Sequence, residues 1–167
     1  MEATITKSDT ETLYSYDDDW TYVDQYAGGY SAKDNYARTR KNHSFDLRFL
    51  SSENGRIYNN TTDWVAGIYY ISQDEKLDRT YPYITNGEYQ SQYKTTNKAA
   101  YGQLDHHLND KTTLTAGLRV EQFDADFEDS YGFDESTSET LYGGKLALSH
   151  EINTSHKGYV ALSKGYK

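Results

Sequence analysis

Residues 44–49 read Ser44-Phe45-Asp46-Leu47-Arg48-Phe49, and residues 114–121 read Leu114-Thr115-Ala116-Gly117-Leu118-Arg119-Val120-Glu121. Apolar and polar residues alternate in both stretches, which is the period of a β-strand and not of a helix. Successive side chains of a strand point to opposite faces of the sheet. The pattern therefore predicts antiparallel strands with one apolar face and one polar face.

Working outward from these stretches, the same alternation predicts seven strands, at about 3–16, 41–51, 63–76, 93–108, 112–127, 139–151 and from 158 onward. Long polar loops are expected at 17–38, 77–92 and 128–138, and short turns at 52–60, 109–111 and 153–157. Outer-membrane barrels combine short periplasmic turns with longer extracellular loops in this way. A soluble meander with uneven loops explains the loop lengths equally well.

The distribution of residues on the two expected faces favours the barrel. One face is expected to carry Phe45, Leu47, Phe49, Leu114, Leu118, Leu146 and Leu148, and the other Asp46, Arg48, Arg119, Glu121 and Lys145. Apolar residues gather toward the short-turn ends of the strands, as in a barrel that projects beyond the membrane. Candidates for aromatic residues at the membrane interfaces are Trp64, Tyr69, Tyr70, Tyr142 and Tyr159, although ordinary cross-strand packing explains any one of them.

The composition excludes several classes of protein. Hydrophobic residues make up 35% of the 167 residues and mean hydropathy is −0.96, yet 18 tyrosines raise the aromatic share to 15%, which a disordered chain would not have. The net charge of −9 argues against a nucleic-acid partner. Cysteine is absent, so disulfides and thiolate metal sites are excluded. The longest nearly apolar run, residues 64–71, is too short for a membrane helix.

Three segments carry a resemblance to a known family. The hairpin of residues 45–52 and 63–70 resembles one that is common in TonB-dependent outer-membrane receptors. Residues 100–104 with 114–119 are similar to the next hairpin, and residues 159–167 resemble a strand that leads into another extracellular loop. The resemblance extends in order over residues 42–167. It implies an all-β fold, an up-and-down meander that forms a segment of a transmembrane β-barrel in the bacterial outer membrane.

The chain also departs from the family pattern. The resemblance implies an N-terminal plug domain, a TonB-contacting segment and 22 strands, whereas residues 1–167 match only part of a barrel. Seven strands cannot close, and no export signal precedes them. We therefore expect a fragment of an active-transport receptor for a scarce ligand such as a ferric siderophore, with lipid as a partner and TonB reached only through the missing N-terminal region. A small structural or adhesive barrel and a soluble β-sandwich binding module are the alternatives.

No catalytic, cofactor or metal site is expected. His106 and His107 are adjacent on a strand and point to opposite faces, and the other three histidines lack metal-ligand spacing. The expected ligand-binding residues lie in the first long loop, where aromatic side chains alternate with acidic ones: Asp17, Asp18, Asp19, Trp20, Tyr22, Tyr26 and Tyr30. Self-packing of that loop is the competing interpretation. In the expected barrel, the side chains predicted to face the lumen are Arg48, Arg119 and Glu121.

Overall fold

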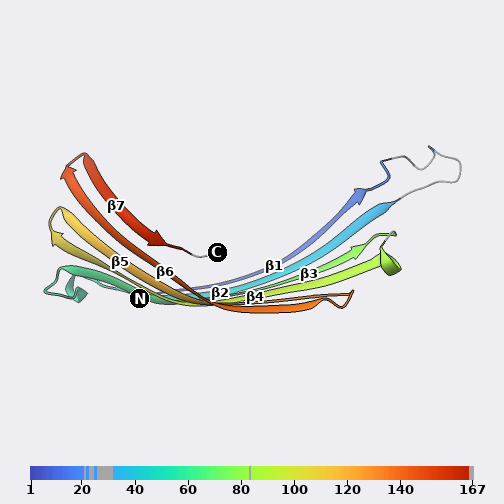
Figure 1. Ribbon diagram of the computed structural model, residues 1–167, viewed down its shortest axis with the longest axis horizontal. Coiled ribbons are helices and arrows are strands. Elements are labelled where there is room, and N and C mark those ends of the chain that lie inside the picture. The colour runs from blue at the N-terminus through green and yellow to red at the C-terminus, as the bar shows by residue number, and fades with distance from the viewer. Residues whose placement is uncertain (21, 23–24, 26–31, 83, 166–167) are drawn as a thin grey trace.

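The structure, a computed structural model, describes residues 1–20, 22, 25, 32–82 and 84–165. Seven strands form one antiparallel sheet in which each strand pairs with its neighbours in the sequence (Figure 1). They are β1 (Glu2–Asp17), β2 (Lys33–Leu50), β3 (Thr62–Thr80), β4 (Glu88–Asn109), β5 (Thr112–Asp129), β6 (Asp134–Asn153) and β7 (His156–Lys164). The predicted meander is confirmed, and the described residues contain no second sheet, contrary to the sandwich alternative.

Within the described residues, helical structure is restricted to two single turns in the connections. They are η1 (Glu53–Gly55) between β2 and β3, and η2 (Thr85–Gly87) between β3 and β4. Among the described residues, no helix is long and apolar enough to cross a membrane.

The predicted loop boundaries were wrong at the polar ends of the strands. The first long loop was expected to reach Arg38, but β2 already begins at Lys33. The loop expected at 128–138 shrinks to residues 130–133, and the one at 77–92 to residues 81–87. These segments are polar and therefore have the composition of loops. In the structure they nevertheless continue to pair with the adjacent strand. The connection 51–61, expected to be a short turn, is longer than either, so the predicted alternation of loop lengths fails.

Three tight turns share one chemical device. The side-chain oxygen Oδ1 of the residue that opens the turn accepts a hydrogen bond from the backbone N–H two residues later. The donors are Lys111 to Asn109 at 3.0 Å, Ser155 to Asn153 at 2.9 Å, and Tyr131 to Asp129 at 2.9 Å. Asn and Asp favour such turns because their short side chains replace a backbone acceptor.

The register assigns every strand residue to one of two faces. We call them the Leu118 face and the Arg119 face. On the Leu118 face, Leu47, Ile68, Ala100, Val120 and Tyr142 are successive cross-strand partners; on the Arg119 face, Arg48, Gly67, Tyr101, Arg119 and Gly143 are. Both predicted sets of residues lie on the expected faces. Of the interface candidates, Trp64, Tyr70 and Tyr142 lie on the Leu118 face, but Tyr69 and Tyr159 do not.

Apolar residues form a continuous band across the Leu118 face. On β5 the band runs from Leu114 to Val120, about 20 Å along the strand at about 3.4 Å per residue. Above the band the face turns polar on β4, β5 and β6 at Lys98, Gln122 and Thr140, and one row higher it is polar on every strand from β2 to β6, at His43, Ser72, Thr96, Asp124 and Ser138. The strands continue beyond this row: Ser72 to Thr80 on β3 adds about 27 Å. A polar extension thus stands above the apolar band, as in a barrel that projects beyond the membrane.

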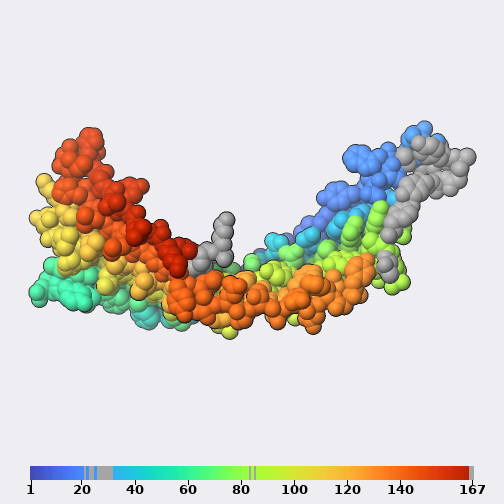
Figure 2. Space-filling view, viewed as in Figure 1, coloured from blue at the N-terminus to red at the C-terminus, as the bar shows by residue number. Residues whose placement is uncertain are grey.

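The two faces differ sharply in exposure. Leu118 is 75% exposed, whereas Glu121, three residues further along the same strand, is 6% exposed. Side chains converge on the inside of a curled sheet and diverge on the outside, so the Arg119 face is the inner one. Figure 2 shows the bent shape of the molecule, without a second layer. The chain exposes 12136 Å², against roughly 8400 Å² for a compact monomer of its mass.

The first prediction concerns contact between the band and lipid. Leu118→Arg should destabilise the complete barrel in a bilayer by about 2–4 kcal/mol, because Leu118 lies in the middle row of the band. Leu13→Arg is the matched control: Leu13 lies on the same face and is 81% exposed, but it belongs to the polar extension. Its substitution should cost about 1 kcal/mol or less. Denaturant titration in lipid vesicles measures both, and equal costs would mean that the band does not face lipid.

The second prediction concerns the isolated chain. Residues 1–167 should aggregate in buffer, because β1 and β7 leave open edges and the apolar band has no second layer to cover it. Detergent should suppress the aggregation. Size-exclusion chromatography with light scattering checks this. A monodisperse monomer that melts cooperatively without detergent would contradict the expectation.

Candidate functional site

A cluster of tyrosines and one ion pair lies on the Arg119 face at the polar end of the first three strands. The rings of Tyr14 and Tyr36 stack with centroids 4.8 Å apart and planes 5° apart. Tyr16 meets both rings edge-on, at 5.7 and 5.9 Å. The Arg79 guanidinium lies 5.1 Å from the centroid of the Tyr36 ring, which is within cation–π range. This part of the face therefore offers flat aromatic surfaces beside a cation.

Asp34 fixes the arrangement of that cluster. Its carboxylate accepts two hydrogen bonds from Arg79, at 2.9 and 2.6 Å, and one from the Tyr36 hydroxyl at 2.9 Å. The hydrogen bond from Arg79 is the main reason that the pKa of Asp34 lies below its usual 3.8. Burial, followed by the hydrogen bond to Asp34, raises the pKa of Tyr36. Asp34 is thus ionised and Tyr36 neutral at physiological pH, which leaves the hydroxyl as a donor.

A second ion-paired cluster follows lower on the same face. Glu75 on β3 binds Arg38 at 2.7 Å and Arg40 at 2.5 Å, both from β2. Arg38 also donates to the Tyr14 hydroxyl at 3.1 Å, which connects this cluster to the tyrosines above. The carboxylate holds two guanidinium groups that would otherwise repel each other.

Level with the apolar band, Glu121 is the centre of the polar face. Its carboxylate accepts from Arg119 at 2.8 and 2.6 Å and from the Asn97 side-chain amide at 2.6 Å. The Arg119 guanidinium also lies 5.6 Å from the Tyr69 ring centroid. Arg48 forms pairs with Glu2 at 3.2 Å and with Asp46 at 3.6 Å. The three residues predicted to face a lumen thus share the polar face, and all three lie in ion pairs.

A fourth cluster surrounds Asp63 at the short-turn end. Asp63 accepts from Arg56 at 2.8 Å and from the Ser51 hydroxyl at 3.0 Å, and His107 Nε2 lies 2.9 Å from its second oxygen. His106, on the opposite face, has Nδ1 2.7 Å from the Thr62 hydroxyl. The predicted opposition of the two histidines is confirmed. In the described part of the chain, no three His, Asp or Glu side chains come together as a metal site would require.

Of the seven loop residues that were predicted to bind a ligand, five lie within the described residues: Asp17, Asp18, Asp19, Trp20 and Tyr22. Asp17 ends β1, and the backbone N–H of Ala32 donates to Asp19 at 2.5 Å, which closes the base of the loop. Asp18 accepts from the Tyr81 hydroxyl. Trp20 is 90% exposed with a φ of 56°, and Tyr22 is 69% exposed. Tyr26 and Tyr30 lie outside the described residues.

Sequence reasoning missed the tyrosine cluster, because it treated Tyr36 as part of a loop and left Arg79 and Asp34 without a role. A signal was present. Tyr14 and Tyr16 are two residues apart, the spacing of one strand face, and Asp34 and Tyr36 repeat that spacing. Two such pairs on neighbouring strands would have predicted a shared face.

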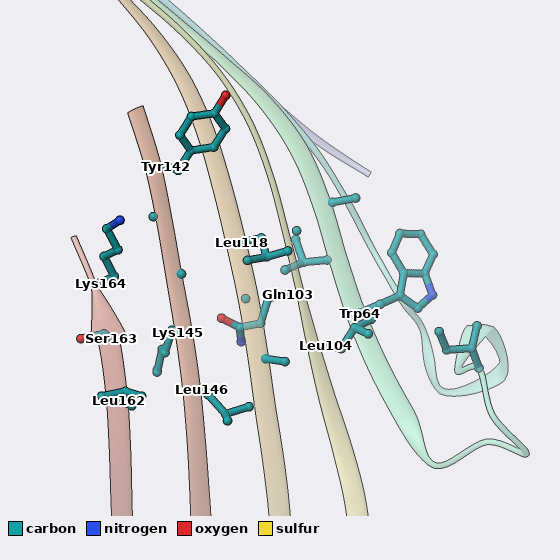
Figure 3. Close-up of a pocket in the computed structure, with 18 residues that line it drawn as sticks. Trp64, Gln103, Leu104, Leu118, Tyr142, Lys145, Leu146, Leu162, Ser163 and Lys164 are labelled. Carbon is teal, nitrogen blue, oxygen red and sulfur yellow. The ribbon is translucent and has the colours of Figure 1, made fainter. Parts of the chain in front are cut away.

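A hollow of about 1100 Å³ opens on the other side of the sheet. Figure 3 shows Leu104, Leu118, Leu146 and Leu162 side by side on four neighbouring strands, with Trp64 and Tyr142 at its margins. These side chains belong to the apolar band. The hollow is therefore part of the band's surface and lies on the face opposite the polar clusters.

The third prediction concerns Gly67, over which the Tyr101 ring packs. A Cβ at Gly67 would lie 2.5 Å from Cζ of Tyr101, whose hydroxyl donates to Asp46 at 3.0 Å. Gly67→Ala should displace the ring, break this hydrogen bond and destabilise the barrel by about 1–3 kcal/mol. Gly102→Ala, whose Cβ would meet nothing closer than 3.5 Å, should cost less than 1 kcal/mol. Denaturant titration of both variants checks this, and equal costs would contradict it.

The fold of this chain resembles that of a solved structure. The chain is similar to the crystal structure of the ferric yersiniabactin uptake receptor FyuA from Yersinia pestis, with a TM-score of 0.68 and 18% sequence identity. The likeness covers 95% of this chain and 24% of that one, so this chain spans about a quarter of that receptor. At such identity the likeness concerns the fold alone. A comparison with curated proteins gives no match.

The family comparison covers almost the entire chain. The model described as TonB dependent receptor-like, beta-barrel matches residues 3–167. Proteins of this family lie in the outer membrane of Gram-negative bacteria, in agreement with the apolar band. The chain therefore belongs to the family of TonB-dependent receptor-like β-barrels.

Proposed function

We propose that this chain is part of a larger barrel, an outer-membrane receptor that takes up a scarce ligand such as a ferric siderophore with energy supplied through TonB. It would contribute wall and loops, not catalysis. The observation that carries the proposal is the division of the wall into an apolar face and an ion-paired face that ends in a tyrosine cluster. A lipid-facing barrel with a polar interior that leads to aromatic groups at one end suits the capture of a solute.

The tyrosine cluster suits a planar or partly aromatic ligand that carries negative charge. Stacking on Tyr14 would require little reorganisation, because its ring is already held in place against Tyr36. Arg79 would offer charge to the ligand while Asp34 keeps its guanidinium in place. The uptake of ferric yersiniabactin, named for the structural neighbour, is compatible with this chemistry.

The loop between β1 and β2 would supply the first contacts. Trp20 and Tyr22 are exposed above the cluster, and Asp18 and Asp19 fix the base of the loop through their contacts with Tyr81 and Ala32. We propose Asp17, Tyr26 and Tyr30 as further members of this site. Exposed aromatics provide large contact area at low entropic cost.

The fourth prediction tests the loop by tryptophan fluorescence. The chain has two tryptophans: Trp20 in the loop, and Trp64 on the Leu118 face near the short-turn end. Titrating the complete receptor with ferric yersiniabactin and other ferric siderophores should quench Trp20. The Trp20→Phe variant should lose this part of the quenching, and Trp64→Phe should retain it. Equal quenching in both variants would contradict binding at the loop.

Energy coupling requires a separate measurement on the same receptor. Cells that carry it should accumulate radioactive iron from the bound siderophore when TonB is present and fail to do so when TonB is deleted. Surface binding should persist in both strains. Uptake that is independent of TonB would contradict the energised mechanism while leaving the binding result intact.

A further inference from the structure

A second group of aromatic rings lies on the Arg119 face, at the polar ends of β4 and β5. The Tyr93 and Phe127 rings have centroids 6.5 Å apart, and Phe133, in the turn after β5, lies 5.9 Å from Phe127. We call Tyr93, Phe127 and Phe133 the ring trio. Tyr93 is 47% exposed and Phe133 is 54% exposed. The rings therefore pack against one another and still leave part of their surface open to a ligand.

Hydrogen bonds hold the turn that carries Phe133. Asp129 Oδ1 accepts from the backbone N–H groups of Tyr131 and Phe133, at 2.9 and 3.0 Å. The backbone N–H of Ser130 donates to the carbonyl of Gln90 on β4 at 2.9 Å, and the Ser130 hydroxyl accepts from the Gln90 N–H at 3.1 Å. The turn is thus attached to β4, and Phe133 is positioned before a ligand arrives. Such preorganisation lowers the entropic cost of binding.

Carboxylates lie beside the rings of β5. Glu135 on β6 is the direct cross-strand partner of Phe127, and Glu139 is the partner of Phe123, four residues earlier on β5. Directly opposed residues of a sheet have Cβ atoms about 5 Å apart. Both glutamates are exposed, and in the part of the chain that the structure describes neither forms an ion pair. The Arg119 face therefore has a phenylalanine opposite an unpaired carboxylate at two levels.

Charge on this face differs between the two sides of the sheet. Between the row of Glu121 and the polar ends of the strands, the Arg119 face of β1, β2 and β3 has a net charge of +1, from Arg38, Arg40, Arg79, Asp34 and Glu75. Over the same rows β4, β5 and β6 have a net charge of −3, from Asp129, Glu135 and Glu139. The lysines of β4, Lys94 and Lys98, lie on the Leu118 face. Carboxylates and the faces of aromatic rings both attract cations, so the side of β4, β5 and β6 favours a cation.

We propose that the ring trio, together with Glu135 and Glu139, is a binding site for a guanidinium or ammonium group. The cation lies against the exposed ring faces and beside the carboxylates of β6. Arg79 in the tyrosine cluster is roughly 17 Å from Phe127, because two strand steps of about 4.8 Å and four residues of about 3.4 Å separate them. Both clusters lie at the same end of the strands (Figure 1). A ligand that spans them would carry an anionic part and a cationic arm, and the cation site itself does not depend on the proposed function.

The test uses the complete receptor that contains this chain, with N-acetyl-arginine amide as the probe. This probe carries one guanidinium and no other charge. In N-acetyl-citrulline amide a neutral ureido group of the same shape replaces the guanidinium. Saturation-transfer NMR should show millimolar, saturable binding of the arginine probe and no saturable binding of the citrulline probe.

Variants on the two faces of one strand pair locate the site. Glu135→Gln with Glu139→Gln should weaken binding of the arginine probe about tenfold, or about threefold per carboxylate. Phe133→Leu, which keeps an apolar side chain but removes the ring, should weaken it about threefold. The matched control is Glu128→Gln with Asp134→Asn, which removes the same charge from a cross-strand pair of β5 and β6 on the Leu118 face. The control should bind within twofold of the unmodified receptor, and heat-modifiable gel mobility confirms that the variants fold.

Three results would overturn the proposal: equal binding of the two probes, undiminished binding by the Glu135/Glu139 variant, or equal losses in that variant and in the control. The last result would mean that the probe responds to net charge and not to this site. The siderophore titration of Trp20, run in parallel, separates the two proposals. Quenching without binding of the arginine probe would reject only the cation site, and probe binding without quenching would reject only the proposed function.

Discussion

The rest of this structure depends on one constraint, the backbone hydrogen bonding between strands that follow one another in the sequence. No water is available inside a bilayer to satisfy N–H and C=O groups, so each strand in the band must pair on both sides. An antiparallel meander achieves this with turns as short as Asp110-Lys111. Once pairing is fixed, the two-residue period assigns each side chain to the Leu118 face or to the Arg119 face. In the part of the chain that the structure describes, β1 and β7 each have one unpaired edge.

The polar face depends on a second constraint, since charges near the band cannot remain unpaired without cost. Glu121 satisfies it with Arg119 and Asn97, and Glu75 with two arginines from β2. Each carboxylate joins at least two residues across strands or along one, so the wall contains short cross-strand networks. Arginine suits these positions because its fork can bind one carboxylate through two nitrogens.

The alternation at residues 44–49 and 114–121 was sufficient to predict the sheet, its order and both faces, because period two is a local property. Strand length was not predictable in the same way. Asp, Ser and Thr in residues 77–80 and 134–138 give these segments the composition of a loop, and only pairing with a neighbouring strand extends the strands through them. The tyrosine cluster was missed for that reason: Tyr14 and Tyr36 stack only if β2 begins at Lys33. Tyr69 and Tyr159 were expected at the membrane interfaces from their positions near the ends of the apolar segments, but the register places both on the Arg119 face.

The row of His43, Ser72, Thr96, Asp124 and Ser138 has a mechanical consequence. The face is polar at this level on all five strands, and on β4, β5 and β6 it turns polar one row lower, at Lys98, Gln122 and Thr140, so the boundary between the apolar band and the polar extension lies within two neighbouring rows. A downward displacement by one row would immerse the Asp124 carboxylate, and an upward one would expose leucines to water, so each direction meets a restoring force from hydrophobic mismatch. The bilayer would thus hold the wall at a fixed depth.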